Sequence, residues 1–128
     1  MGLREENFVA EDVTVLVVDD DEDVRAVTVM ALEDRGFVVR EASDGGEALS
    51  ALERHPEIDV VVTDIMMPGI SGFHVARGVR SRRPDVKVLM VSAYAAGLVD
   101  AQLPPEEFLA KPFRLGDLEK AVVRLLRN

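Results

Sequence analysis

Polar side chains that can carry out chemistry stand at the ends of apolar runs in this sequence. They are Asp19, Asp20 and Asp21 after residues 13–18, Asp64 after 58–63, Ser92 after 86–91, and Lys111 after 106–110. Clustered carboxylates bind hard cations, and a carboxylate can also act as a nucleophile toward phosphorus. A lysine ammonium and a hydroxyl are suited to binding phosphoryl oxygens. The residue types therefore indicate phosphoryl chemistry, provided that the fold brings them together.

The apolar runs predict a parallel sheet whose strand ends meet. Residues 13–18 are rich in valine and do not alternate with polar residues, which is typical of a strand buried on both faces. Strands are expected at 13–18, 37–41, 58–63, 86–91 and 106–110, with helices at about 22–35, 45–54, 72–82 and from about 115. Such alternation implies right-handed crossovers and helices on both faces of the sheet. The predicted fold class is α/β, a doubly wound five-stranded parallel sheet with strand order 2-1-3-4-5.

Short polar side chains predict where the helices begin. Asp21, Asp44 and Ser71 each precede a helical segment and are expected to cap its N-terminus. Asp44 is followed three residues later by Glu47, the spacing of a capping box. The inward face of the first helix is expected to consist of Val24, Val27, Ala31 and Leu32.

The predicted strand order brings three acids together. Strands one and three are neighbours in this order, so Asp19, Asp20 and Asp64 are expected to converge. Two carboxylates about 4 Å apart repel by about 4 kcal/mol at an effective dielectric constant of about 20. Such a cluster is tolerated when some of its members are protonated or when a cation lies among them. Because the set offers oxygen ligands without histidine or cysteine, Mg²⁺ is the expected ion.

Length and charge limit the classes of function. The chain has 128 residues, a formal charge of −9 and no cysteine. We expect one domain at 13–128, preceded by a polar leader or linker at 1–12. The negative charge argues against direct nucleic-acid binding, and no apolar run approaches the length of a membrane span. The lack of cysteine is compatible with a reducing cytoplasm, which is the expected location.

Four segments resemble the receiver domain of bacterial two-component response regulators. They are VVDDD at 17–21, TDIMMPG at 63–69, VSA at 91–93 and KPF at 111–113. They occur in the order found in that family, and the resemblance extends over residues 13–128. It implies a signalling switch that is not a conventional turnover enzyme.

The resemblance implies roles for the residues of the acidic cluster. Asp64 would accept a phosphoryl group from a sensor histidine kinase or a phosphotransfer domain, assisted by Lys111. Mg²⁺ would be bound by Asp19, Asp20 and Asp64 together with the backbone carbonyl of Met66. Whether Asp19 or Asp20 contacts the metal directly stays open.

The resemblance also implies a switching mechanism. Ser92 would bind the new phosphoryl group, and Phe108 would rotate into the space that Ser92 leaves. The face of helix four, strand five and helix five would relay the change. The peptide bond between Lys111 and Pro112 would be cis, and Tyr94 is a further aromatic candidate near the phosphoryl site.

The chain departs from the family pattern between strands four and five. Gly97 and the pair Pro104–Pro105 leave room for only a shortened fourth helix, so a standard dimer is not expected. Receivers of hybrid histidine kinases vary in this segment, and the chain is also compatible with a domain excised from such a kinase. The downstream partner is not indicated by the sequence.

Three other protein classes share features with this sequence. A flavodoxin shares the strand order, but three aspartates in its first loop would repel the FMN phosphate. A haloacid-dehalogenase-like phosphatase needs an acid two residues after its nucleophile, where this chain has Met66. A pseudo-receiver, which binds partners without phosphorylation, needs an incomplete site.

Overall fold

The structure, a computed structural model, describes residues 9–92 and 108–127 of the chain. Its elements are η2 (Ala10–Asp12), β1 (Thr14–Val18), α1 (Glu22–Asp34), β2 (Val38–Ala42), α2 (Gly45–Arg54), β3 (Ile58–Asp64), α3 (Gly72–Arg82), β4 (Lys87–Ser92), β5 (Phe108–Ala110) and α5 (Leu115–Arg127). The alternation of strands and helices follows the predicted order. The observed boundaries lie within a few residues of the predicted ones.

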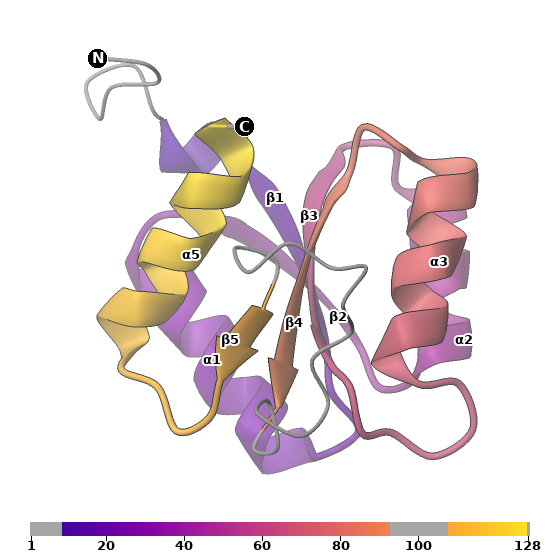
Figure 1. The fold of residues 1–128 in the computed structure, drawn as a ribbon. Helices are drawn as coiled ribbons and strands as arrows, with labels where there is room; N and C mark the ends of the chain where they lie inside the picture. The colour runs from indigo at the N-terminus through magenta and orange to yellow at the C-terminus, as the bar shows by residue number, and fades with distance from the viewer. Residues whose placement is uncertain (1–8, 93–107, 128) are drawn as a thin grey trace.

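The strands form one sheet in the order β2-β1-β3-β4-β5, and all neighbouring pairs are parallel. Helices α1 and α5 cover one face of this sheet, and α2 and α3 cover the other (Figure 1). The predicted doubly wound α/β fold is therefore confirmed. The order makes β1 and β3 direct neighbours, with Val18 opposite Thr63 at their carboxyl ends. Acids that follow these two strands must lie on the same edge of the sheet.

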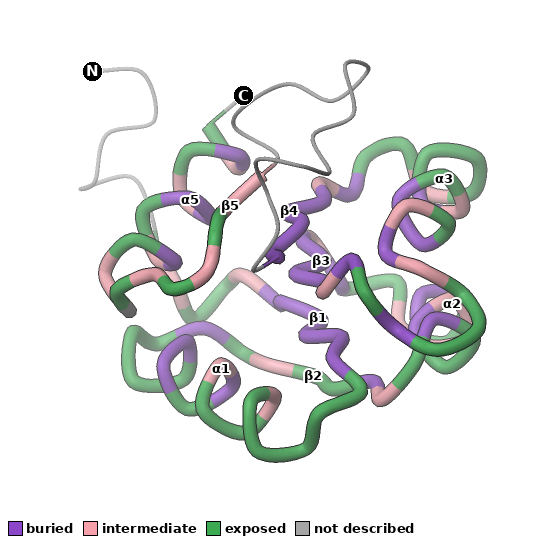
Figure 2. Tube along the Cα trace, turned by 60° about the horizontal axis from the view of Figure 1, so that its bottom comes forward, coloured by how far each residue is buried: buried purple, intermediate pink, exposed green. Residues whose placement is uncertain are grey.

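The central strands bury both of their faces. Along β1, Leu16 and Val18 pack into the cluster shared with α2 and α3, while Val15 and Val17 pack into the cluster shared with α1 and α5. In Figure 2 the central strands are therefore coloured as buried, with exposed helix surfaces around them. This explains why the apolar runs do not alternate, because successive side chains enter two different cores.

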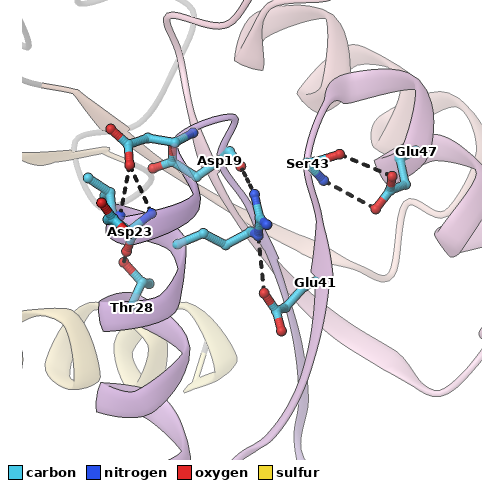
Figure 3. Close-up of polar contacts among 9 residues, drawn as sticks. Asp19, Asp23, Thr28, Glu41, Ser43 and Glu47 are labelled. Atoms are coloured by element: carbon cyan, nitrogen blue, oxygen red, sulfur yellow. Dashed lines mark hydrogen bonds and ion pairs between the residues drawn. The ribbon is translucent and has the colours of Figure 1, made fainter.

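The predicted helix caps are confirmed. Asp21 accepts hydrogen bonds from two backbone N–H groups in the first turn of α1, each at 3.0 Å. Asp44 accepts the N–H of Glu47 at 2.7 Å, and Ser71 caps α3. The Glu47 carboxylate accepts from the N–H and the hydroxyl of Ser43, so the reciprocal contact of the capping box lies one residue earlier than expected (Figure 3).

The prediction for the inward face of α1 was partly wrong. The buried residues of this helix are Val29, Ala31 and Leu32. Val24 and Val27 are instead exposed, at 37% and 57%. The inward line runs through Arg25, Val29 and Leu32 at helical spacing, and the Arg25 side chain is only 16% exposed. A hydrophobic pattern could not reveal this line because its first member is a cation.

Several predictions lie outside the described residues. They are the shortened fourth helix, Tyr94, and residues 106 and 107 of the fifth strand. The described end of the predicted leader forms the 3₁₀ turn η2, and its Ala10 packs against the core shared with α1 and α5. Among the helices that the structure describes, none has the length and apolar character needed to cross a membrane.

Candidate functional site

Three acids meet at the carboxyl ends of β1 and β3. Asp19, Asp20 and Asp64 each offer a carboxylate oxygen, and these three oxygens lie within 4.8 Å of one another. The loop after β1 supplies two of the acids, and the last residue of β3 supplies the third. The donor set consists of oxygen atoms, which is the chemistry that Mg²⁺ prefers in proteins. The residues therefore fit a magnesium ion.

Asp19 is the most deeply placed member of the cluster. It is 6% exposed, and its Oδ1 accepts the backbone N–H of Asp21 at 2.9 Å. Burial raises the pKa of the Asp19 carboxyl, because desolvation disfavours the charged form; Asp64 and Asp20 add to this effect. The N–H of Asp21 and the ammonium of Lys111 oppose it. A cation bound among these acids would relieve the unfavourable burial of charge.

Lys111, which follows the edge strand β5, brings a positive charge to the cluster. Its Nζ lies 3.6 Å from Asp64 Oδ2 and 3.7 Å from Asp19 Oδ2. The residue follows β5, and its backbone N–H donates to the carbonyl of Ser92 at 2.9 Å. The peptide bond between Lys111 and Pro112 is cis, as expected. Lys111 therefore contacts acids from both β1 and β3.

Asp64 is held by the backbone around it. Its side chain is 15% exposed, and its Oδ1 accepts the N–H of Met66 at 3.3 Å. The next residue, Ile65, donates its N–H to the carbonyl of Val91 at 3.2 Å, which extends the β3–β4 ladder beyond the strand. Met66, two residues after Asp64, is exposed at 58%.

The two predicted switch residues lie on the adjoining strands. Ser92 is the last residue of β4 and is 1% exposed. Phe108 is the first residue of β5, pairs with Met90 in the sheet register, and packs half-buried against the core shared with α2 and α3. Both lie along the path from Asp64 to the β5 edge of the sheet, and their switching roles stay predictions.

Comparison with known proteins identifies the family. Residues 15–123 match the response regulator receiver domain. The chain is a receiver domain of this family. It is 41% identical to the sensor kinase CckA of Brucella abortus over 119 residues, which are 90% of this chain and 13% of CckA. It is 33% identical over 115 residues to the response regulator receiver protein CpdR of the same organism, covering 88% of this chain and 95% of CpdR.

Solved receiver structures share the fold. The crystal structure of a response regulator receiver protein from Sinorhizobium medicae superposes with a TM-score of 0.82 at 32% identity. The match covers 94% of this chain and 100% of that chain. Receiver domains are signalling modules of two-component systems. The chain thus spans most of one curated relative and a small part of another, which is how a module used both alone and within larger proteins behaves.

Two residues near the receiver site were missed by sequence reasoning. Gly72 opens α3, and a Cβ atom there would lie 2.4 Å from the Asp64 carbonyl oxygen and 2.8 Å from the Cα of Ile65. Arg25 lies on the inward line of α1 and contacts the loop that carries Asp19. Neither residue has a signal in the sequence, because a glycine after a cap is ordinary and a hydrophobic pattern does not detect an arginine.

Replacing Gly72 with alanine should destabilise the receiver domain. The new Cβ would meet backbone atoms at the end of β3, which cannot rotate away as a side chain can. We expect Gly72→Ala to lower the free energy of unfolding by about 2 kcal/mol, within the range for overpacked sites. Urea denaturation monitored by circular dichroism measures this change.

The matched control is Gly116→Ala in α5. A Cβ at Gly116 would meet nothing within 4 Å, and alanine favours the helix by about 0.5–1 kcal/mol over glycine. This variant should be as stable as the parent chain or more so. Equal stability of the two variants would show that the close approach at Gly72 has no energetic consequence.

Removing one charge from the cluster should stabilise the metal-free domain. Asp20 is exposed, and a charge pair about 4 Å apart repels by about 1 kcal/mol even in water. Asp20→Asn should therefore raise the melting temperature in EDTA by a few degrees, and it should reduce the further rise that Mg²⁺ gives the parent chain. Asp34→Asn, a charge change at the far end of α1, should keep the full Mg²⁺ response. A lower melting temperature of Asp20→Asn in EDTA would contradict the repulsion.

Proposed function

We propose that this receiver domain is a phosphorylation-controlled switch whose phosphoacceptor is Asp64. The donor is the phosphohistidine of a sensor histidine kinase or a phosphotransfer domain, and the reaction takes place in the cytoplasm. Asp19, Asp20 and Asp64 would hold Mg²⁺ together with the backbone carbonyl of Met66. The observation that supports this proposal most is the placement of Asp64 within 3.6 Å of the Lys111 ammonium and beside two further acids.

The chemistry is the displacement of one bond to phosphorus by another. A carboxylate oxygen of Asp64 attacks the phosphorus, the new P–O bond forms, and the P–N bond to the donor imidazole breaks. The electron pair of that bond leaves with the imidazole nitrogen, which takes up a proton. Mg²⁺, when bound, neutralises charge on the phosphoryl oxygens.

Lys111 links the reaction to a change of state. Its ammonium is shared between Asp19 and Asp64 before the reaction. The phosphoryl group brings a charge of about −2 in place of the single carboxylate charge, so the ammonium has a stronger partner on the new oxygens. Ser92 would donate its hydroxyl to the same group, and Phe108 would move into the vacated space. The face of helix four, β5 and α5 would then change.

Full switching sets a requirement on this mechanism. Moving an equilibrium from about 1:99 to about 99:1 needs about 5.5 kcal/mol of preference for the active form. The charge-assisted contacts of the phosphoryl group with Lys111 and Ser92 are the source of that preference. The two residues sit on adjacent strands, joined by the N–H of Lys111 and the carbonyl of Ser92. Their movements are therefore expected to be coupled.

An apolar groove beside the acids suits a helical phosphodonor. The groove has a volume of about 590 Å³ and is lined chiefly by Val24, Val27, Pro112 and Phe113. Lys111 lines both this groove and a small cavity that Asp19 and Asp64 also line, so the groove adjoins the acids. A donor helix that covers the exposed valines would bring its histidine close to Asp64. We therefore place the donor's docking surface here.

Phosphorylation by a small donor tests the function directly. With acetyl phosphate and Mg²⁺, the chain should gain the mass of one phosphoryl group, and EDTA should prevent the gain. Asp64→Asn should lose it, because an amide oxygen is a far weaker nucleophile toward phosphorus. Asp59→Asn, on the same strand, is the control and should keep the modification. Intact-protein mass spectrometry resolves all four samples.

The alternatives give different outcomes in the same experiment. A pseudo-receiver would show no mass gain in the parent chain. A phosphatase would turn over 4-nitrophenyl phosphate continuously, which would need an acid at the position of Met66. Equal labelling of the parent chain and Asp64→Asn would place the phosphoacceptor elsewhere.

The groove makes a prediction about protein donors. Val27→Ser removes apolar surface from the groove without adding charge, so phosphotransfer from an autophosphorylated histidine kinase should slow by about tenfold, near the effect expected for one buried valine. Phosphorylation by acetyl phosphate should not change. Met30→Ser is the control, since Met30 is exposed on the same helix but does not line the groove. Equal slowing by the two substitutions would argue against this docking surface.

A further inference from the structure

We infer that Arg25 is a positioning residue of the metal site: it fixes the backbone of Asp19 so that Asp19 and Asp20 face Asp64. This inference rests on the proposed function, because it concerns Mg²⁺ binding at that site. Arg25 is not a ligand, since its guanidinium is a cation that can only donate hydrogen bonds. It would act through the loop that carries two of the three acids.

The contacts of Arg25 join the loop to the neighbouring strand. Its Nη1 donates to the backbone carbonyl of Asp19 at 2.8 Å, and its Nε donates to Glu41 Oε1 at 3.1 Å. Figure 3 labels the two partners, Asp19 and Glu41, and marks both hydrogen bonds by dashed lines. Glu41 belongs to β2, and the carbonyl belongs to the residue that follows β1. One guanidinium therefore ties two elements together at the start of the metal loop.

The rest of the loop is held from the side of the helix. Asp19 Oδ1 accepts the N–H of Asp21, and the Asp21 carboxylate caps α1. The backbone N–H of Arg25 in turn donates to the carbonyl of Asp21 at 2.9 Å. The backbone of Asp19 also donates to the carbonyl of Ala42 at 3.2 Å. Asp20 is thus placed by its neighbours, and Arg25 contacts the loop at both of its ends.

The loop needs such restraint because its acids repel one another. Asp19, Asp20 and Asp64 gather three carboxylates within 4.8 Å, and repulsion favours a loop that swings away from β3. A guanidinium donates in a fixed planar geometry, so bonds to a carbonyl and to Glu41 define its direction. Its burial at 16% exposure distinguishes it from the surface arginines of the chain.

Glu41 has a separate electrostatic part in this arrangement. An unneutralised cation beside a Mg²⁺ site would oppose binding of the ion. The Glu41 carboxylate offsets the charge of Arg25 at 3.1 Å while leaving its other N–H groups free to bind the Asp19 carbonyl. Because Glu41 neutralises Arg25, the guanidinium can hold the loop in place without repelling Mg²⁺. Lys111, by contrast, contacts the acids themselves.

Charge and positioning predict opposite effects for Arg25→Ala. If Arg25 acts only through its charge, its removal should tighten Mg²⁺ binding, because a nearby cation is lost. If Arg25 positions the loop, binding should weaken by about tenfold or more, which is the usual effect of losing a partner that orients metal ligands. The sign of the change therefore separates the two explanations.

The experiment is a Mg²⁺ titration of the full chain followed by NMR chemical shifts, with no phosphodonor present. Arg25→Ala should raise the Mg²⁺ dissociation constant by about tenfold. Arg25→Lys should recover only part of this loss, because an ammonium lacks the planar fork. Glu41→Gln should weaken binding by a smaller factor. Arg40→Ala is the matched control: Arg40 lies in β2 and pairs with Glu57 at 2.8 Å, and this substitution should leave the dissociation constant unchanged.

The outcomes separate failure of this inference from failure of the proposed function. If the parent chain shows no saturable Mg²⁺ binding, the proposed function fails. If the parent chain binds Mg²⁺ and Arg25→Ala binds it equally well or more tightly, the positioning inference alone is overturned. Circular dichroism in EDTA checks that Arg25→Ala is folded; if it is not, Glu41→Gln decides, with unchanged affinity overturning the inference.

Discussion

The mutual repulsion of three carboxylates is the constraint on which the rest of this structure depends. Asp19, Asp20 and Asp64 can stay together only because rigid strands deliver them to one edge of the sheet. The two apolar cores hold those strands in register and supply most of the stabilisation. The unfavourable charge cluster is thereby offset by packing elsewhere. The three acids therefore lie close enough together to hold a cation.

Positive charge is distributed around the cluster in two different ways. Lys111, which follows β5, contacts the carboxylates directly, as the proposed exchange onto a phosphoryl group requires. Arg25 touches the backbone from α1 and is itself neutralised by Glu41, so it can hold the loop without competing with a metal. Lys111 is therefore suited to a group that moves, and Arg25 to a group that stays in place. The proposed function calls for both, because it combines a stable metal site with a change of state.

Much of the fold could be predicted from the sequence. The non-alternating valine runs indicated strands buried on both faces, and their alternation with helices indicated the strand order, from which the convergence of the aspartates followed. The caps Asp21, Asp44 and Ser71 were found because short polar side chains before a helix act locally. The inward face of α1 was misjudged because valines lie on both sides of the helix, and burial depends on what the rest of the chain brings to each side.

The sequence by itself determined the chemistry of this protein: oxygen ligands without sulfur or imidazole, one lysine and one serine at strand ends, and a core made of small apolar side chains. Only the tertiary structure decided the distances that make this chemistry usable, such as the approach of Lys111 to Asp19 and Asp64. It also decided that Arg25 turns inward and that Gly72 must lack a side chain. The physical reason is that residue type fixes what a group can bind, whereas contacts between segments distant in sequence fix which partner it meets.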